Sequence, residues 1–230
     1  MNWKNVSDMP SQLSYFFKNL PVVTRNLLYV NLIMFLATLI NPSFMKDTFA
    51  MAFPLSAEFR WWQPLTHMFM HDGFFHIFFN MYSLVIFGMV VERALGTRKF
   101  LLFYFVAGFG AVALHFGVQY LQLQEIIKAN PGLDPQYVYA AVPGILGASG
   151  AIYGILVGFA MLYPQARLTL IFPPITLDAK WWVAIFIVIE FIASIGGSRV
   201  GIAHLAHLGG ALFGFLLIRW WKRTGKLGRG

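Results

Sequence analysis

Six long apolar stretches alternate with short polar ones along the chain. They lie at about residues 27–40, 74–91, 100–121, 148–164, 181–195 and 202–221. The first ends before Pro42, and the fourth is short and rich in glycine. Because a helix needs about 20 apolar residues to cross a bilayer, the pattern predicts six crossing helices in an all-α, polytopic membrane bundle.

The segment between the first two apolar stretches has a different character. Residues 45–66 are only half apolar, and the run 59–62 combines three aromatic side chains with one arginine. Aromatic and basic side chains are typical of the boundary between lipid and water. We therefore expect this segment to lie on the bilayer surface and not through it.

The composition supports a membrane protein. Hydrophobic residues make up 58% of the 230 positions and charged residues 11%, whereas about 25% of a soluble domain is charged. This balance excludes a disordered chain and argues against a water-soluble globule. The absence of cysteine removes disulfides, thiolate nucleophiles and cysteine-ligated metals. The net charge is +8, but the basic residues lie between the apolar stretches and do not form a basic helix. Nucleic acid is therefore not an expected partner.

The positions of the positive charges predict the orientation. Segments 1–25, 92–99, 164–180 and 219–230 hold 13 of the 17 Lys and Arg residues. Because cytoplasmic segments carry the excess of positive charge, both termini are predicted to be cytoplasmic. The second, fourth and sixth helices then start at the outer face.

The same pattern divides the chain into three regions. We predict a cytoplasmic N-terminal segment at 1–24, a six-helix transmembrane domain at 25–221 and a basic cytoplasmic tail at 222–230. The first 24 residues contain no apolar core with a small-residue cleavage site, so no removable signal peptide is expected. The basic ends and the lack of a transit-peptide pattern favour a bacterial cytoplasmic membrane.

Polar side chains within the apolar stretches gather near the predicted outer face. They belong to the starts of the second, fourth and sixth helices, and they are His71, His76, Asn80, Ser149, His204 and His207. Two helical turns span about 10 Å, so these side chains are expected at similar depth. Polar groups in a bilayer are costly and are kept for function or for contacts between helices.

Ser149 and His207 form the minimum set for nucleophilic acyl transfer. An imidazole can remove the hydroxyl proton and later return it to the leaving amine. His76 and Asn80 are four residues apart, so both project from one helix face, where they can donate hydrogen bonds to a developing oxyanion. Ser149 also stands at a helix N-terminus, whose unpaired backbone N–H groups supply further donors.

Glycines are placed so that two of these helices can approach closely. Gly210 and Gly214 share the helical face of His207. A second strip, on the fourth helix, consists of Gly150, Gly154 and Gly158. Small residues let helix backbones come together in a membrane, so we expect the two strips to pack against each other.

Four short motifs stand between about residues 60 and 215. They are His76-Ile77-Phe78-Phe79-Asn80, Glu92-Arg93-Ala94-Leu95-Gly96, Gly147-Ala148-Ser149-Gly150, and Ala206-His207-Leu208-Gly209-Gly210 followed by Gly214. In their order and spacing, these motifs together resemble the rhomboid family of intramembrane serine proteases.

The resemblance implies a six-helix bundle that hydrolyses peptide bonds in or beside the transmembrane segments of single-span membrane proteins, without a cofactor or metal. It implies that Ser149 is the nucleophile and His207 the general base and acid. His76, Asn80 and the backbone N–H of Ser149 are implied to stabilise the oxyanion. Tyr153 matches an aromatic residue that packs against the imidazole, and the supporting glycines are Gly147, Gly150, Gly210 and Gly214.

The resemblance also assigns roles to two segments outside the site. The loop before the second helix corresponds to the family's membrane-embedded first loop, and the fifth helix with its following loop corresponds to the substrate gate. One position differs, because the family often has Trp-Arg in the first loop where this chain has Trp62-Gln63. Anchoring of the loop by arginine is therefore not expected here.

Two polar features allow other interpretations. His204 and His207 with His71 and His76 suggest a metal clamp, but no acidic ligand accompanies them, so no metal is predicted. Glu190 stands near the middle of the fifth helix, and three roles compete for it. It could be a neutral structural acid, a gate latch or a group that orients a histidine. We favour the structural acid, because the polar layer is expected nearer the outer face than Glu190.

Two other functions fit a polytopic bundle. A catalytically silent rhomboid-like module that binds or escorts membrane proteins would be expected to lack the serine or the histidine, and both are present. A channel or transporter would show inverted repeats or paired charges, and the sequence shows neither.

Overall fold

The described part of the chain is built from helices. The computed structural model describes residues 17–170, 174–195 and 201–227, and each of the six predicted segments contains a helix. They are α2 (Val22–Ile40), α5 (Phe74–Ser83) continued by η3 (Leu84–Gly88) and α6 (Met89–Leu95), α7 (Thr97–Ala129), α9 (Ser149–Leu162), α10 (Ala179–Ile195) and α11 (Gly201–Arg223). The all-α fold class is confirmed.

Several of the helices have the character of membrane spans. The stretches Val22–Ile40, Phe74–Leu95 and Thr97–Ala129 are long and apolar enough to cross a bilayer, and Ser149–Leu162 is a shorter apolar helix. The protein is therefore a polytopic membrane protein. The total of six crossings stays a prediction.

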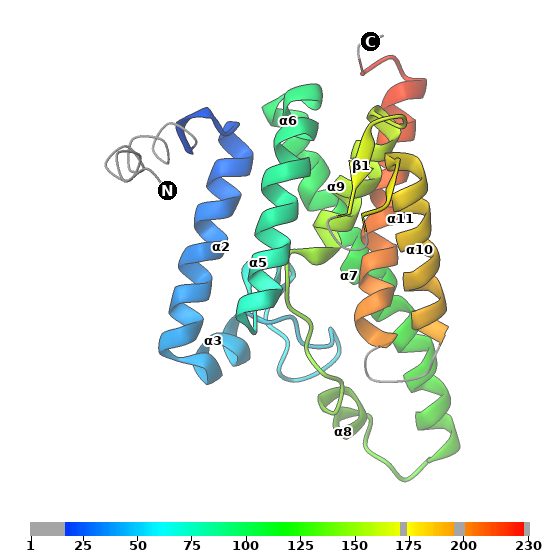
Figure 1. The fold of residues 1–230 in the computed structure, drawn as a ribbon. Helices are drawn as coiled ribbons and strands as arrows, with labels where there is room; N and C mark the ends of the chain where they lie inside the picture. Colours follow the sequence, from blue (N-terminus) through cyan, green and yellow to red (C-terminus); the bar gives the residue numbers. More distant parts are fainter. Residues whose placement is uncertain (1–16, 171–173, 196–200, 228–230) are drawn as a thin grey trace.

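The helices alternate in direction through the bundle (Figure 1). α2, α7 and α10 run one way, whereas α5, α9 and α11 run the other way. The starts of α5, α9 and α11 therefore lie toward one end of the bundle, and α2 starts and α11 ends at the opposite end (Figure 1). Helices that are far apart in the sequence thus present their first turns to a common region.

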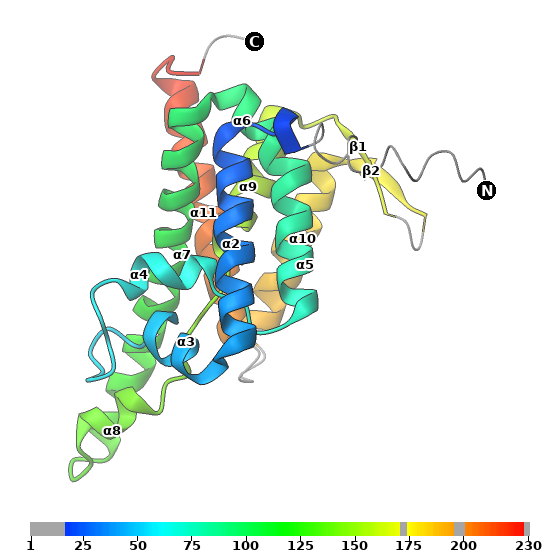
Figure 2. The same ribbon diagram turned by 90° about the vertical axis from the view of Figure 1, so that its left-hand side faces the viewer.

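α7 is longer than the predicted segment at 100–121, because it has 33 residues. At 1.5 Å per residue it is about 50 Å long, and its last turns extend beyond the bundle toward α8 (Pro135–Ala140; Figure 2). The apolar pattern stops near Leu121, but the Gln, Glu and Lys residues that follow are good helix formers and continue the helix.

Short elements occupy the polar stretches. α3 (Pro42–Phe49), α4 (Gln63–Thr66) and the 3₁₀ turn η2 (His67–Phe69) form the segment expected at the bilayer surface. Strands β1 (Arg167–Thr169) and β2 (Thr176–Asp178) form an antiparallel hairpin that pairs Arg167 with Asp178. Three residues are too few to show the alternation that identifies a strand in a sequence, so this hairpin was not predicted.

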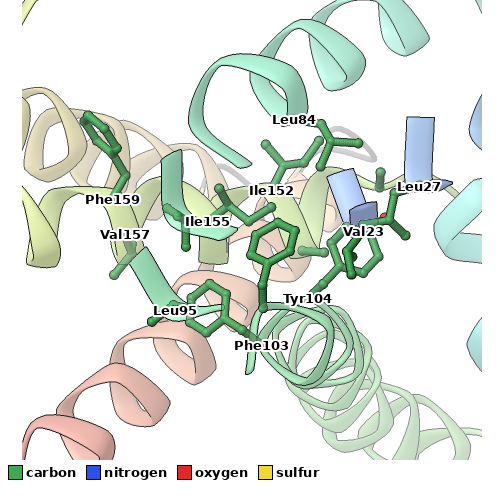
Figure 3. Close-up of a cluster of buried hydrophobic side chains, with 14 of the residues drawn as sticks. Val23, Leu27, Leu84, Leu95, Phe103, Tyr104, Ile152, Ile155, Val157 and Phe159 are labelled. Atoms are coloured by element: carbon green, nitrogen blue, oxygen red, sulfur yellow. The ribbon is translucent and has the colours of Figure 1, made fainter. Parts of the chain in front are cut away.

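α9 lies at the centre of the bundle. Nine of its 14 residues are buried, and Ile152 and Ile155 lie among Leu84, Phe103 and Tyr104 in the cluster of buried side chains shown in Figure 3. A helix that is apolar on all sides is suited to a surrounded position. The helix that begins with Ser149 is thus held from several directions.

The two glycine strips predicted to pack together are in contact. A Cβ atom added at Gly210 would lie 1.8 Å from the carbonyl oxygen of Gly150. One added at Gly214 would lie 2.8 Å from Cα of Gly154. The backbones of α9 and α11 therefore touch directly, which no larger residue at Gly210 permits.

Glu92 connects α6 to the start of α2. Its carboxylate accepts hydrogen bonds from the backbone N–H of Val23 at 2.9 Å, and from the N–H and hydroxyl of Thr24 at 2.7 and 2.8 Å. The first N–H groups of a helix have no partner within the helix, and they favour a negative charge. Glu92 therefore caps α2 from a neighbouring helix.

Gln63 holds the loop between α3 and α5. Its side chain is 1% exposed, and its carbonyl oxygen accepts hydrogen bonds from the N–H groups of Ala52 and Arg60 at 3.2 and 3.0 Å. The loop also pairs with the segment before α9 through backbone hydrogen bonds between Met51 and Ile145. An uncharged amide thus anchors the loop at the position where the resembled family often has arginine.

We expect Gly210→Ala to destabilise the protein by about 3 kcal/mol, because the new methyl group overlaps the backbone of α9. Gly117→Ala is the matched control, since a Cβ at that α7 position meets nothing within 4 Å. Unfolding in detergent, followed by circular dichroism during titration with a denaturing detergent, measures both. Equal stability of the two variants would contradict the close approach of α9 and α11.

Glu92→Gln is expected to cost about 2–4 kcal/mol of unfolding free energy, because an amide cannot accept all three hydrogen bonds and loses the charge. The control is Glu125→Gln, which removes an exposed ion pair with Lys128 and is expected to cost less than about 1 kcal/mol. The same unfolding measurement applies. A Glu92→Gln variant as stable as the Glu125→Gln variant would rule out the capping role.

Candidate active site

Ser149 and His207 lie within hydrogen-bonding distance of each other. Ser149 is the first residue of α9, and its Oγ is 2.9 Å from Nε2 of His207 on α11. The touching glycines Gly150 and Gly210 stand one and three residues further along the two helices. The contact between the two backbones therefore sets the distance between hydroxyl and imidazole.

Gly147 shapes the turn that leads into α9. Its φ of +127° lies in a region that residues with a side chain rarely adopt, and a Cβ there would lie 2.8 Å from Nε2 of His76. Its N–H donates to the carbonyl of His67 at 2.9 Å. Glycine is required here both by the backbone conformation and by the closeness of the His76 ring.

The two predicted oxyanion donors, His76 and Asn80, have different partners in the structure. His76 brings its Nε2 close to Gly147, while its Nδ1 is 2.8 Å from Oδ1 of Asp72. Asn80 is 6% exposed and donates one amide hydrogen to the backbone carbonyl of His76 at 2.9 Å. His76 therefore reaches the turn before Ser149 from α5, whereas the observed bond of Asn80 stays within its own helix.

A cavity of about 560 Å³ opens beside the serine. Ser149, Gly150, His207, Gly147 and His76 lie in its wall, and Asn80 is absent from the described residues that line it. The wall continues to charged and polar residues between α2 and α5, which are Lys46, Asp47, Glu58, Gln63 and Asp72. The serine hydroxyl thus faces a space that has both apolar and polar walls.

Burial and local charges shift the pKa values of the groups just before the start of α5. Burial, together with the neighbouring His76, lowers the pKa of His71 to about 3. Burial lowers the pKa of His67 to about 4, although its hydrogen bond to Gln63 raises it. For Asp72, burial raises the pKa, but the hydrogen bond to His76 and the charges of His76 and Lys46 together hold the pKa below its ordinary value. His67 and His71 are therefore neutral near pH 7, and Asp72 is ionised.

Tyr153 covers the imidazole of His207, as the resemblance implies. The two rings are stacked, with centroids 4.3 Å apart and planes 9° from parallel. Tyr153 lies one turn after Ser149 on α9, so the same helix carries the hydroxyl and the aromatic ring. The Tyr153 hydroxyl donates a hydrogen bond to Oε1 of Glu190.

Glu190 lies beside the serine–histidine pair, which corrects the expectation that it lies deeper than this layer. Its Oε2 is 3.0 Å from Nδ1 of His207 and is hydrogen-bonded to Nδ1 of His204. Glu190 is five residues from the end of α10 at Ile195, and His207 is six residues after the start of α11. At 1.5 Å per residue both are about 8 Å from the same end of the bundle. Counting residues from the facing ends of the two helices would have found this neighbour.

Three potential metal ligands come together in the same place. Glu190, His204 and His207 each offer one ligand atom, and these three atoms lie within 4.8 Å of one another. Two imidazoles and a carboxylate are a ligand set that suits Zn²⁺. The clamp considered from the sequence paired these histidines with His71 and His76, but His76 instead contacts Asp72.

Comparison with known proteins agrees with the motifs. The family model described as "Rhomboid domain" matches residues 58–222. The chain is 30% identical over 167 residues to the rhomboid protease AarA of Providencia stuartii, and the aligned region covers 72% of this chain and 57% of AarA. It is 33% identical over 161 residues to the putative rhomboid protease YdcA of Bacillus subtilis, covering 70% of this chain and 67% of YdcA.

Mitochondrial proteins are also similar to this chain. The chain is 30% identical over 155 residues to "Rhomboid protein 1, mitochondrial" of Saccharomyces cerevisiae, which covers 64% of this chain and 38% of the relative. The chain thus spans between about two fifths and two thirds of the length of these three relatives. Because the family model covers most of the chain and three of the four motifs supply residues of the described site, the chain belongs to the rhomboid family of membrane proteins, which includes proteases.

Proposed function

We propose that the protein is an intramembrane serine endopeptidase that cleaves peptide bonds in or beside the transmembrane segments of single-span membrane proteins. The observation that carries this proposal is the 2.9 Å contact between Ser149 Oγ and His207 Nε2 at the edge of the cavity. A hydroxyl bonded to an imidazole is the arrangement of an activated nucleophile. Family membership and the named rhomboid proteases support the same activity.

In the proposed reaction His207 acts first as base and then as acid. Nε2 takes the Ser149 proton while Oγ forms a bond to the substrate carbonyl carbon. The imidazolium then gives the proton to the leaving nitrogen, the carbon–nitrogen bond breaks, and an acyl ester remains on Ser149. Water, with its proton taken by Nε2, attacks the ester and releases the second product and the serine hydroxyl.

Donors around Ser149 support the oxyanion in this proposal. The backbone N–H of Ser149 stands at the N-terminus of α9, where the helix dipole favours negative charge. His76 approaches from the side of Gly147, with Asp72 on its other ring nitrogen. Asn80 has a second amide hydrogen besides the one it gives to the His76 carbonyl, and the proposal assigns that hydrogen to the oxyanion.

The hydrolysis step needs water inside the bundle, and the cavity supports its supply. Its volume of about 560 Å³ exceeds the space of a single water molecule many times. The charged Lys46, Asp47 and Asp72 at its wall favour a hydrated entrance. A substrate helix must also unwind locally, because its helical hydrogen bonds shield the carbonyl groups.

The proposed orientation places both termini in the cytoplasm and the site near the outer face of a bacterial cytoplasmic membrane. The distribution of 13 of 17 positive charges supports it. The start of α2 and the end of α11 at one end of the bundle agree with it (Figure 1). Single-span membrane proteins then reach the site from the lipid.

Ser149→Ala and His207→Ala are each expected to lower cleavage at least about 10³-fold, because either change removes the nucleophile or its base. The purified protein is incubated in detergent with a panel of transmembrane substrates, and products are measured by mass spectrometry. Ser194→Ala on α10 is the control, since its hydroxyl donates to a carbonyl of its own helix, that of Phe191.

Two reagents extend this test. A fluorophosphonate should label the parent protein on Ser149, and EDTA should leave cleavage unchanged. Cleavage that survives in both variants would sink the proposed function. Binding of substrates without any cleavage by the parent would identify a catalytically silent rhomboid-like module instead.

His76→Ala and Asn80→Ala are expected to lower kcat by on the order of 10²-fold and to change KM little, since an oxyanion donor acts in the transition state. Tyr82→Phe, at an exposed position on the same helix, is the control. Steady-state kinetics with one cleaved substrate measure the two constants. A loss in KM alone would contradict the oxyanion role of either residue.

A further inference from the structure

Glu190 differs from its neighbours on α10. The residue is 7% exposed, whereas Val188, Ile189, Phe191 and Ile192 are all more than half exposed on the surface of the bundle. The helix therefore turns apolar side chains outward and this one carboxyl group inward. A carboxyl group in a membrane is costly unless other groups satisfy it, so its partners reveal its role.

Three groups from two other helices surround this carboxyl group. The Tyr153 hydroxyl of α9 donates to Oε1, and Nδ1 of His204 on α11 is bonded to Oε2. Nδ1 of His207 is 3.0 Å from Oε2, although the atoms do not form an aligned hydrogen bond. Two nitrogens and a hydroxyl around one carboxyl group match an ionised carboxylate, which accepts hydrogen bonds on both oxygens.

The two nitrogens of the His207 ring thus face different partners. Nε2 faces Ser149 Oγ and Nδ1 faces Glu190 Oε2. To accept the serine proton, Nε2 must be free of hydrogen, so the neutral ring must carry its hydrogen on Nδ1. A carboxylate beside Nδ1 favours that tautomer, and its negative charge favours the imidazolium that forms when Nε2 takes the proton.

Tyr153 supports both groups at once. Its ring stacks on the imidazole at 4.3 Å, and its hydroxyl holds Oε1 of Glu190, which leaves Oε2 for the histidines. Nδ1 of His207 lies 3.0 Å from Oε2, which is already within reach of a hydrogen bond. Hydrogen bonds of this kind are often poorly aligned without substrate and tighten when it binds.

We infer that Glu190 is a positioning residue for the hydrolysis, which holds the His207 hydrogen on Nδ1 and offsets the charge of the imidazolium. This inference rests on the proposed function. A purely structural carboxyl group would be satisfied by Tyr153 and His204 alone, without facing the nitrogen opposite Ser149. The site is therefore a chain of three side chains, in which Ser149 of α9 contacts His207 of α11 and His207 contacts Glu190 of α10.

The first experiment compares Glu190→Gln with the Ser194→Ala control from the same helix. Glutamine keeps the shape of the side chain and removes its charge. We expect kcat and the rate of fluorophosphonate labelling of Ser149 to fall on the order of 10²-fold, with KM within about twofold. The labelling rate reports the activation of the serine independently of substrate entry. Equal kcat in the two variants would overturn the inference.

The second experiment observes the tautomer directly and needs no variant of Glu190. ¹⁵N spectra of histidine-labelled parent protein in detergent, with the His207 signals assigned from His207→Ala, show which ring nitrogen carries hydrogen. Hydrogen on Nδ1 is the expected result near neutral pH. Hydrogen on Nε2 in the neutral ring would overturn the inference even if Glu190→Gln does not fold.

The outcomes separate this inference from the function on which it rests. Cleavage retained by Ser149→Ala defeats the proposed function, whatever Glu190→Gln does. Loss of cleavage in Ser149→Ala together with full activity in Glu190→Gln defeats only the role of Glu190. Loss of parent activity in EDTA and its recovery with Zn²⁺ would also overturn the inference, because the carboxylate and the two histidines would then be metal ligands.

Discussion

The direct contact between the backbones of α9 and α11 is the interaction on which the site depends. The carbonyl of Gly150 occupies the place where a side chain at Gly210 would begin. Ser149 and His207 lie next to this contact, so the separation of the two helices becomes the separation of hydroxyl and imidazole. Apolar side chains pack equally well against lipid and protein, and close approach of small residues is what selects one pair of helices in a membrane.

Buried polar groups then tie the remaining elements to this pair. Glu92 caps α2 from α6, Gln63 holds the loop beside the cavity, and Glu190 links α10 to α9 and α11. In each case the partner comes from an element distant in the sequence or from a loop that has no regular hydrogen bonds of its own. An unpaired group of this kind would be costly in a low-dielectric interior, so each one favours a single arrangement of the bundle.

Sequence patterns located most of the polar site and placed Glu190 wrongly. Ser149, His207 and Tyr153 come together as the motifs and helical periodicity indicated. A position near the middle of an apolar segment predicts a greater depth for Glu190, whereas its distance from the end of α10 decides its contact with α11. The sequence places Asn80 on the helix face of His76, but its observed hydrogen bond is made within that helix.

The sequence by itself determined that the protein lies in a membrane, where its helices lie and which residues have suitable chemistry, because these properties depend on local composition and on a period of 3.6 residues. Only the tertiary structure decided that Glu190 faces the nitrogen of His207 opposite Ser149, that an amide at Gln63 anchors the loop, and that α7 reaches beyond the bundle. Contacts between separate helices depend on their relative depth and rotation, which a local pattern does not contain.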